Sequence, residues 1–309
     1  MAKTKNKSAG TYTSDIHDDS VYINPLTDFG FKRLFYNKEL LMSFLNDVVG
    51  TDIKDIVYRP TEGLGWFYEE RTIIFDLLCT TQDDDFIVVE MQLGRQTYFR
   101  DRTLFYGAHI IRKQAPRRKY WNFNLKTVYI VSILNFNVFN DETSKDKVIE
   151  RAYVYRETVQ ERLSDKLQMI FIELPKFKKE ASELQDNTDM WLYLLKNTVG
   201  LKTCPSEITG RIFKLFLEIS EKNQLTPTEM DRYAVSLERS YQMRDVANYA
   251  RMEGKQEGKQ EGKREGLMEK SIQFAIKLLM RNETIEDVVA LTDLSREQVQ
   301  ALLNQLPKA

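Results

Sequence analysis

The chain has 309 residues, of which 42% are hydrophobic and 11% aromatic, and these fractions exclude a largely disordered protein. The formal net charge of −1 excludes a protein that is basic throughout, so any nucleic-acid contact must come from locally segregated charge. Two cysteines, a polar N-terminus and no apolar run of ~18 residues predict a cytoplasmic protein with no disulfide framework and no membrane partner.

The first elements expected along the chain are two short helices and a strand. Thr27 or Asp28 can cap a helix that runs through FGFKRLF, whose apolar side chains recur with helical spacing. A second helix is expected over residues 38–48, and a short strand over residues 52–58 follows it.

A hairpin is expected next, with two apolar strands that each carry one acid. Residues 71–79 predict the first strand, which has Asp76 in its middle. Residues 86–89 predict the second strand, which leads directly to Glu90. The polar residues 82–85 supply the turn that joins the two strands.

The acids of this hairpin predict a metal site. Side chains alternate along a strand, so Glu90 and Gln92 share a face, and the adjacent strand can set Asp76 beside them. An acid on a buried apolar strand is costly unless it is paired or binds a cation. The alternative is a buried carboxylate network neutralised by Arg71 or Arg95.

A basic segment follows the hairpin. Residues 96–114 predict a helix, and the stretch from Arg95 to Lys126 holds nine cations and one acid, Asp101, with aromatic side chains interleaved. This pattern predicts a phosphate-binding surface, and the alternative is a solvated helix face followed by a basic loop. The predicted DNA-binding residues are Arg95, Arg112, Lys113, Arg117, Arg118 and Lys119.

The remainder of the chain predicts three more strands and then helices. The apolar residues 127–134 suit a strand that is buried on both faces and is reached by a helical crossover. Further strands are expected over residues 148–156 and 169–174, and helices over residues 190–196, 207–221 and 227–252.

The sequence EGKQEGKQEGKREG at residues 253–266 is a four-residue repeat. As a helix it would place like charges four residues apart and would carry four glycines, each costing about 1 kcal/mol relative to alanine. The repeat therefore predicts a linker or a marginal helix. The alternative is close helix packing across the glycines in a homodimer.

The last segment, residues 267–309, predicts a small helical tail. Thr284 with Asp287, and Ser295 with Gln298, have the spacing of capping boxes, so two short helices are expected. The pattern resembles a helix-turn-helix, which many structural helical hairpins share.

Phosphodiester cleavage is the chemistry that fits these acids beside a basic segment. It requires a hard divalent cation with oxygen ligands and an activated water. Asp76, Glu90 and the Met91 backbone carbonyl can hold Mg²⁺, with Mn²⁺ as a substitute, and Gln92 can orient the water or a phosphate oxygen. The sequence has no GxxxxGK[ST] or GxGxxG motif, which disfavours a nucleotide-dependent enzyme.

Four motifs carry a resemblance to a known family: NPLTDFGFKRLF, FDLL, VVEMQ and YFRDRTLFYGAHIIRKQ. They resemble the Rpn-type recombination-promoting nucleases, also called PD-(D/E)XK family transposases, of the PD-(D/E)XK nuclease superfamily. The resemblance covers residues 22–114 closely and extends to about residue 174. It implies an α/β restriction-endonuclease-like core with αβββαβ order, a mixed sheet flanked by helices, and a C-terminal helical appendage.

The resemblance also implies a Mg²⁺-dependent DNA endonuclease linked to recombination or mobile elements. Asp76 and Glu90 match the metal-binding acids, whereas Gln92 stands where the superfamily usually has lysine and Phe75 where it has proline, which leaves the general base open. Asp28 and Lys32 lie on a helix that often faces such a site, although Asp28 can equally be a helix cap. Arg102 can contact phosphate or pair with an acid.

The expected domains are a disordered tail (1–18), a nuclease-like domain (19–180), a helical appendage (181–252), the repeat (253–266) and the helical tail (267–309). The alternative function is a DNA-binding or assembly protein whose nuclease site is weak or inactive. A homodimer is the expected partner arrangement if both DNA strands are cut by one metal site per chain.

Overall fold

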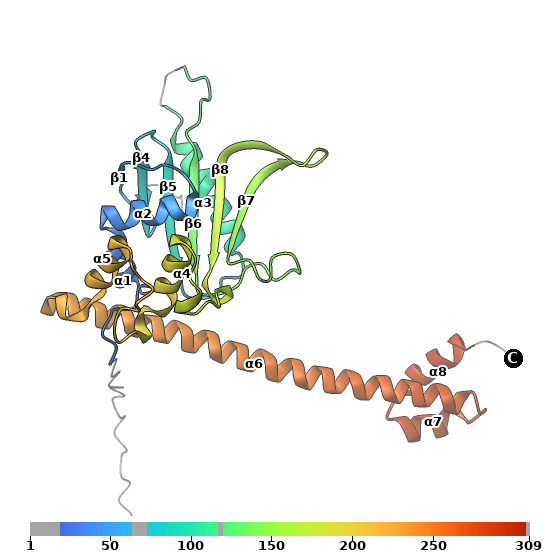
Figure 1. The fold of residues 1–309 in the computed structure, drawn as a ribbon. Helices are drawn as coiled ribbons and strands as arrows, with labels where there is room; N and C mark the ends of the chain where they lie inside the picture. Colours follow the sequence, from blue (N-terminus) through green and yellow to red (C-terminus); the bar gives the residue numbers. More distant parts are fainter. Residues whose placement is uncertain (1–18, 64–72, 117–119, 307–309) are drawn as a thin grey trace, which may run out of the picture. The chain divides into compact units, whose positions relative to one another are not determined.

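The computed structural model describes residues 19–63, 73–116 and 120–306 (Figure 1). The chain divides into two compact units, Met1–Arg244 and Asp245–Ala309. The first unit contains the helices α1 (Asp28–Phe35), α2 (Lys38–Val49), α3 (Phe99–Lys113), α4 (Asn187–Asn197) and α5 (Arg211–Ser220). Its strands are β1 (Ile56–Tyr58), β2 (Glu62–Gly63), β3 (Ile73–Ile74), β4 (Leu77–Thr81), β5 (Phe86–Gln92), β6 (Val128–Leu134), β7 (Ile149–Arg156) and β8 (Glu161–Glu173).

Six of these strands form a mixed sheet in the order β1-β4-β5-β6-β8-β7. The pairs β5–β6 and β6–β8 are parallel and the other pairs are antiparallel. β6 is buried along its whole length between two parallel neighbours, and α3 supplies the crossover from β5. This arrangement confirms the predicted α/β fold with a restriction-endonuclease-like core.

Helices cover both faces of the sheet, and alternation along β5 decides which residues face which layer. Val88 packs with Tyr106 and Ile110 of α3 on one face. Val89 belongs to the larger core on the other face, which includes the fully buried Trp191 of α4. Glu90 and Gln92 follow the same alternation as Val88, so they lie on the α3 side of the sheet.

The predicted strand over residues 71–79 is interrupted. β3 pairs with β2 in a separate two-stranded ladder, and β4 begins only at Leu77. Phe75 and Asp76 lie between them, because the Asp76 amide N–H donates to the Glu90 carboxylate. The prediction of one continuous strand was therefore wrong, and Asp76 sits at a break next to β4. Arg71 lies outside the described residues.

One strand and two helices differ from the predictions. β8 begins at Glu161 rather than at Met169, since its polar first half pairs with β7 as a largely exposed hairpin. The helices α4 and α5, expected in an appendage over residues 181–252, instead pack into the main core. Trp191 of α4 packs against Phe213 and Phe216 of α5, and its ring meets Phe213 at 5.1 Å between centroids.

The helix α6 (Pro227–Leu279) begins in the first unit and continues through the whole glycine repeat. A Cβ added at any of the four repeat glycines would meet nothing within 4 Å. The repeat is thus helical, and its glycines are not required by any close approach within the described chain.

The second unit is a small helical cluster. The end of α6 packs with α7 (Ile285–Thr292) and α8 (Arg296–Gln305) around Ala275, Val288 and Val299. Ser295 forms with Gln298 the capping box predicted from their spacing, whereas Thr284 caps α7 by accepting from the Asp287 N–H. Within the described ranges, every helix is too short or too polar to cross a membrane.

Candidate active site

Asp76, just before β4, lies beside Glu90 of the neighbouring strand β5. The antiparallel register pairs Leu77 with Val89, which places the preceding Asp76 beside Glu90. The Asp76 amide N–H donates to Glu90 Oε1 at 3.2 Å, and the Met91 amide N–H donates to Asp76 Oδ2 at 2.8 Å. Each carboxylate therefore accepts a backbone hydrogen bond from the segment that carries the other.

Burial makes it costly to ionise both acids. Glu90 is only 2% exposed. Burial first, and then the nearby Asp76 carboxylate, raise the pKa of Glu90 to about 8. Burial also raises the pKa of Asp76, and the nearby Asp28 carboxylate raises it further. The Met91 N–H, Lys32 and Arg102 lower this pKa, but they do not outweigh burial. A divalent cation between these acids would relieve both costs.

Arg102 of α3 links Glu90 to the side-chain amides of Gln96 and Gln92. Its Nη2 lies 3.4 Å from Glu90 Oε2, its Nη1 donates to Gln96 Oε1 at 2.9 Å, and its Nε donates to the Tyr106 hydroxyl at 2.7 Å. Gln96 Nε2 in turn donates to Gln92 Oε1 at 3.0 Å, and Gln92 Nε2 donates to Glu90 Oε2 at 3.4 Å. Of the two roles predicted for Arg102, the geometry shows the pairing with an acid.

Gln96 and Tyr106 were missed in the sequence, although both bond to Arg102. Tyr106 follows Arg102 by four residues, and this helical spacing could have indicated their contact. Gln96 is uncharged and precedes α3, so nothing in its local pattern distinguishes it from a solvated loop residue.

The helix α1 brings Asp28 and Lys32 near Asp76. Thr27 is the N-cap, since its hydroxyl accepts from the Gly30 N–H, and Asp28 is free to pair with Lys32 at 2.8 Å. Burial alone would lower the pKa of Lys32, but Asp28 and then Asp76 raise it above its ordinary value. Lys32 is thus a protonated cation within electrostatic reach of Asp76.

Residues far along the chain hold α1 in place. Arg33 Nη1 pairs with Glu229 Oε1 of α6 at 2.7 Å, and the Phe29 N–H donates to Ser236 Oγ at 3.0 Å. The Asn24 N–H, just before α1, donates to a tyrosine hydroxyl of the same helix at 3.0 Å. The first three turns of α6 therefore hold in place the helix that carries Asp28 and Lys32.

The three predicted DNA-binding cations that the structure describes do not gather at one place. Arg95 is exposed before α3, whereas Arg112 and Lys113 are exposed in its last turn, about 20 Å along the helix from its start. Burial and then Arg112 lower the pKa of Lys113. Arg117, Arg118 and Lys119 lie outside the described residues.

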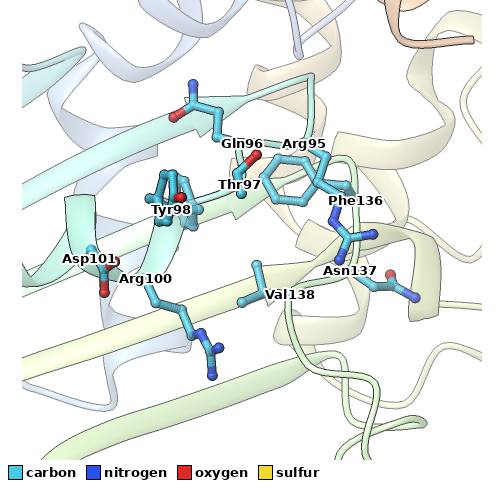
Figure 2. Close-up of a pocket in the computed structure, with 10 residues that line it drawn as sticks. Arg95, Gln96, Thr97, Tyr98, Arg100, Asp101, Phe136, Asn137 and Val138 are labelled. Atoms are coloured by element: carbon cyan, nitrogen blue, oxygen red, sulfur yellow. The ribbon is translucent and has the colours of Figure 1, made fainter. Parts of the chain in front are cut away.

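A pocket of about 280 Å³ lies beside the acids (Figure 2). One side is the segment from Arg95 to Asp101, which leads into α3, and the other is the segment from Phe136 to Val138 after β6. Gln96 lines this pocket and also bonds to Gln92 and Arg102. The pocket is therefore connected to Glu90 through one intermediate side chain, either Gln92 or Arg102.

A family model described as PD-(D/E)XK nuclease family transposase matches residues 25–250, more than half of the 309-residue chain. The chain belongs to this family. Comparisons with curated proteins and with solved structures gave no match. Membership in the PD-(D/E)XK nuclease family supports a nuclease-like function, and the match spans the sheet, α3 and the helices that complete the main core.

Nucleases of the PD-(D/E)XK type generally use divalent metals, and the acids present here fit such an ion. Two carboxylates, Asp76 and Glu90, converge, and in the described part of the chain Arg102 is the one cation in contact with them; oxygen ligands are those that Mg²⁺ prefers. Among the described residues, no group of three or more His, Cys, Asp or Glu side chains could hold a metal. A Mg²⁺ ion would therefore complete its shell with backbone oxygen, water and substrate phosphate.

Proposed function

We propose that this chain is a DNA endonuclease that uses Mg²⁺, or Mn²⁺ in its place, and acts in recombination or in the movement of mobile elements. The observation that carries the proposal is the convergence of two carboxylates, the half-buried Asp76 just before β4 and the buried Glu90 on β5. Asp76 and Glu90 would hold the ion together with the Met91 backbone carbonyl. When bound, the ion polarises the scissile phosphate and lowers the pKa of a coordinated water.

The remaining residues position the substrate and supply positive charge. Gln92 is held by Glu90 and Gln96, so its amide can orient the attacking water but cannot remove a proton from it. Lys32 supplies the cation that Gln92 lacks, since it stays protonated beside Asp76 and can stabilise charge on the phosphate. Asp28 orients Lys32 through their ion pair.

Cleavage of plasmid DNA by the full-length chain, in buffers with Mg²⁺, Mn²⁺ or EDTA, tests this function. Asp76→Asn and Glu90→Gln should each lower the cleavage rate by at least about 100-fold. Asp84→Asn is the matched control because Asp84 is an exposed acid in the turn of the same hairpin, where asparagine tolerates its positive φ. If the two site variants fold and cut like wild type, the site assignment is wrong.

The alternative is a DNA-binding or assembly protein with a weak site. It is favoured by one observation, namely that the amide of Gln92 is occupied by two partners where a lysine would offer charge. The same cleavage assay distinguishes the two functions, because a wild-type chain that binds DNA and never cuts it with either metal supports the alternative. A homodimer, which would place one site on each DNA strand, is tested by light scattering with and without DNA.

A further inference from the structure

The pocket next to the acids has one wall that is fixed in place. Glu173, which is fully buried, accepts from the Val138 N–H and pairs with the buried Lys176. The Phe136 ring meets the buried Phe99 ring edge-on, with 5.7 Å between centroids. The segment after β6 is therefore held by a buried charge and by aromatic packing, so the pocket is preformed rather than created by a ligand.

The opposite wall presents an aromatic ring and charges to solvent. The Tyr98 side chain is 74% exposed at the start of α3, and Arg95 and Arg100 are exposed on either side of it. Figure 2 shows these side chains together with Asp101 around the pocket. Exposed aromatic rings flanked by guanidinium groups are the combination that proteins use to stack bases and hold phosphates.

The acid among these residues argues against a site for a bare anion. Asp101 lines the same pocket and would repel a free phosphate. A nucleobase carries N–H groups that can donate to this carboxylate, while its phosphates can contact Arg95 and Arg100. The mixture of acceptor, cations and aromatic ring therefore fits a whole nucleotide.

The volume of the pocket suits a single base better than a base pair. Its volume of about 280 Å³ is close to the lower limit of about 300 Å³ for ligand pockets, which suits a single base. A base in a duplex is stacked and paired, and it must leave the helix to enter such a pocket.

We propose that this pocket binds one unpaired nucleotide next to the scissile phosphate, with its base on Tyr98 and its phosphates on Arg95 and Arg100. The proposal rests on the nuclease function proposed above and narrows its substrate to DNA with a single-stranded segment. Gln96 joins the pocket to Gln92 and Arg102, both of which contact Glu90, so the bound nucleotide is linked to the acids through these two side chains.

Binding of the full-length chain to DNA in EDTA tests the proposal without cleavage. The probes are a single-stranded oligonucleotide containing 2-aminopurine and its duplex, followed by anisotropy and by the fluorescence change that stacking causes. Wild type should bind the single strand more tightly, with a change in 2-aminopurine fluorescence. Tyr98→Ala should weaken this binding about 10-fold, and Tyr98→Phe should preserve it.

Two further variants separate the pocket from general effects. Phe105→Ala is the matched control, because Phe105 is a 54% exposed aromatic residue of the same helix that does not line the pocket. The double change Arg95→Gln and Arg100→Gln should reduce the salt slope of single-strand binding by about 1.4, or about 0.7 per phosphate contact.

The proposal is overturned if Tyr98→Ala binds the single strand as tightly as wild type, or if only duplex DNA binds and 2-aminopurine is unaffected. Such a result together with normal cleavage would leave the nuclease function intact and remove the pocket from substrate recognition. Tyr98-dependent binding without cleavage under any metal would instead support the pocket and refute the nuclease.

Discussion

Replacing Glu90 by glutamine should stabilise the metal-free protein while abolishing cleavage. The pKa of Glu90 rises from its ordinary 4.5 to about 8 in the folded chain, so the folded state keeps this proton longer than the unfolded state. Stability of the wild type should therefore fall as the pH rises from about 4.5 to about 8. At pH 7 the cost is about 3 kcal/mol, from about 2.5 pH units at 1.36 kcal/mol each. Glutamine carries no such cost and can still accept the Asp76 N–H.

Thermal unfolding in EDTA at several pH values measures this effect. Glu90→Gln should unfold about 6 °C above wild type at pH 7, with the difference vanishing near pH 4.5. Addition of Mg²⁺ should stabilise the wild type and not the variant, because the ion needs both carboxylates. Asp84→Asn, in the exposed turn, should match wild type throughout. A Glu90→Gln variant no more stable than wild type at pH 7 would refute the argued cost of ionisation.

Three further changes test the parts of the fold that carry the site. Gly30→Ala should destabilise the chain by about 1–3 kcal/mol in urea unfolding, since its Cβ would lie 2.0 Å from the Asn24 carbonyl oxygen, whereas Gly94→Ala meets nothing and should be neutral. Gly258→Ala should stabilise α6 by about 1 kcal/mol, which thermal unfolding followed by circular dichroism measures, because the added Cβ meets nothing. A lower helicity would contradict this and would indicate that a partner packs closely against this glycine. Lys32→Gln should slow cleavage about 10-fold or more with little change in DNA affinity, Lys32→Arg should restore part of the rate, and an equal loss of affinity would contradict a role in the reaction.

Local signals in the sequence were sufficient for many elements of the fold. The alternation that places Glu90 and Gln92 on one face follows from strand geometry, and the apolar run of β6 marks a strand buried between neighbours. The caps at Thr284 and Ser295 were also predictable, because a capping box involves only residues three positions apart.

The remaining features depend on contacts between distant segments. The break at Asp76 arises because its N–H bonds to the Glu90 side chain, which a strand propensity cannot reveal. A tryptophan such as Trp191 predicts burial, but the sequence around it does not indicate that its helix packs into the main core. Gln96 acquires its importance only when α3 places Arg102 beside it.

The contacts that hold α1 against α6 have a consequence for when the site is completed during synthesis. A ribosome synthesises the chain from its N-terminus at about 5–20 residues per second, so roughly 7–30 s separate Glu90 from Ser236. During that interval the acids exist in the nascent chain, but Arg33 and Phe29 lack their partners on α6. A product that ends before this helix would carry both acids without the fixed α1 that presents Lys32. Cleavage competence is thus expected only late in translation, after the helix that follows the sheet has emerged.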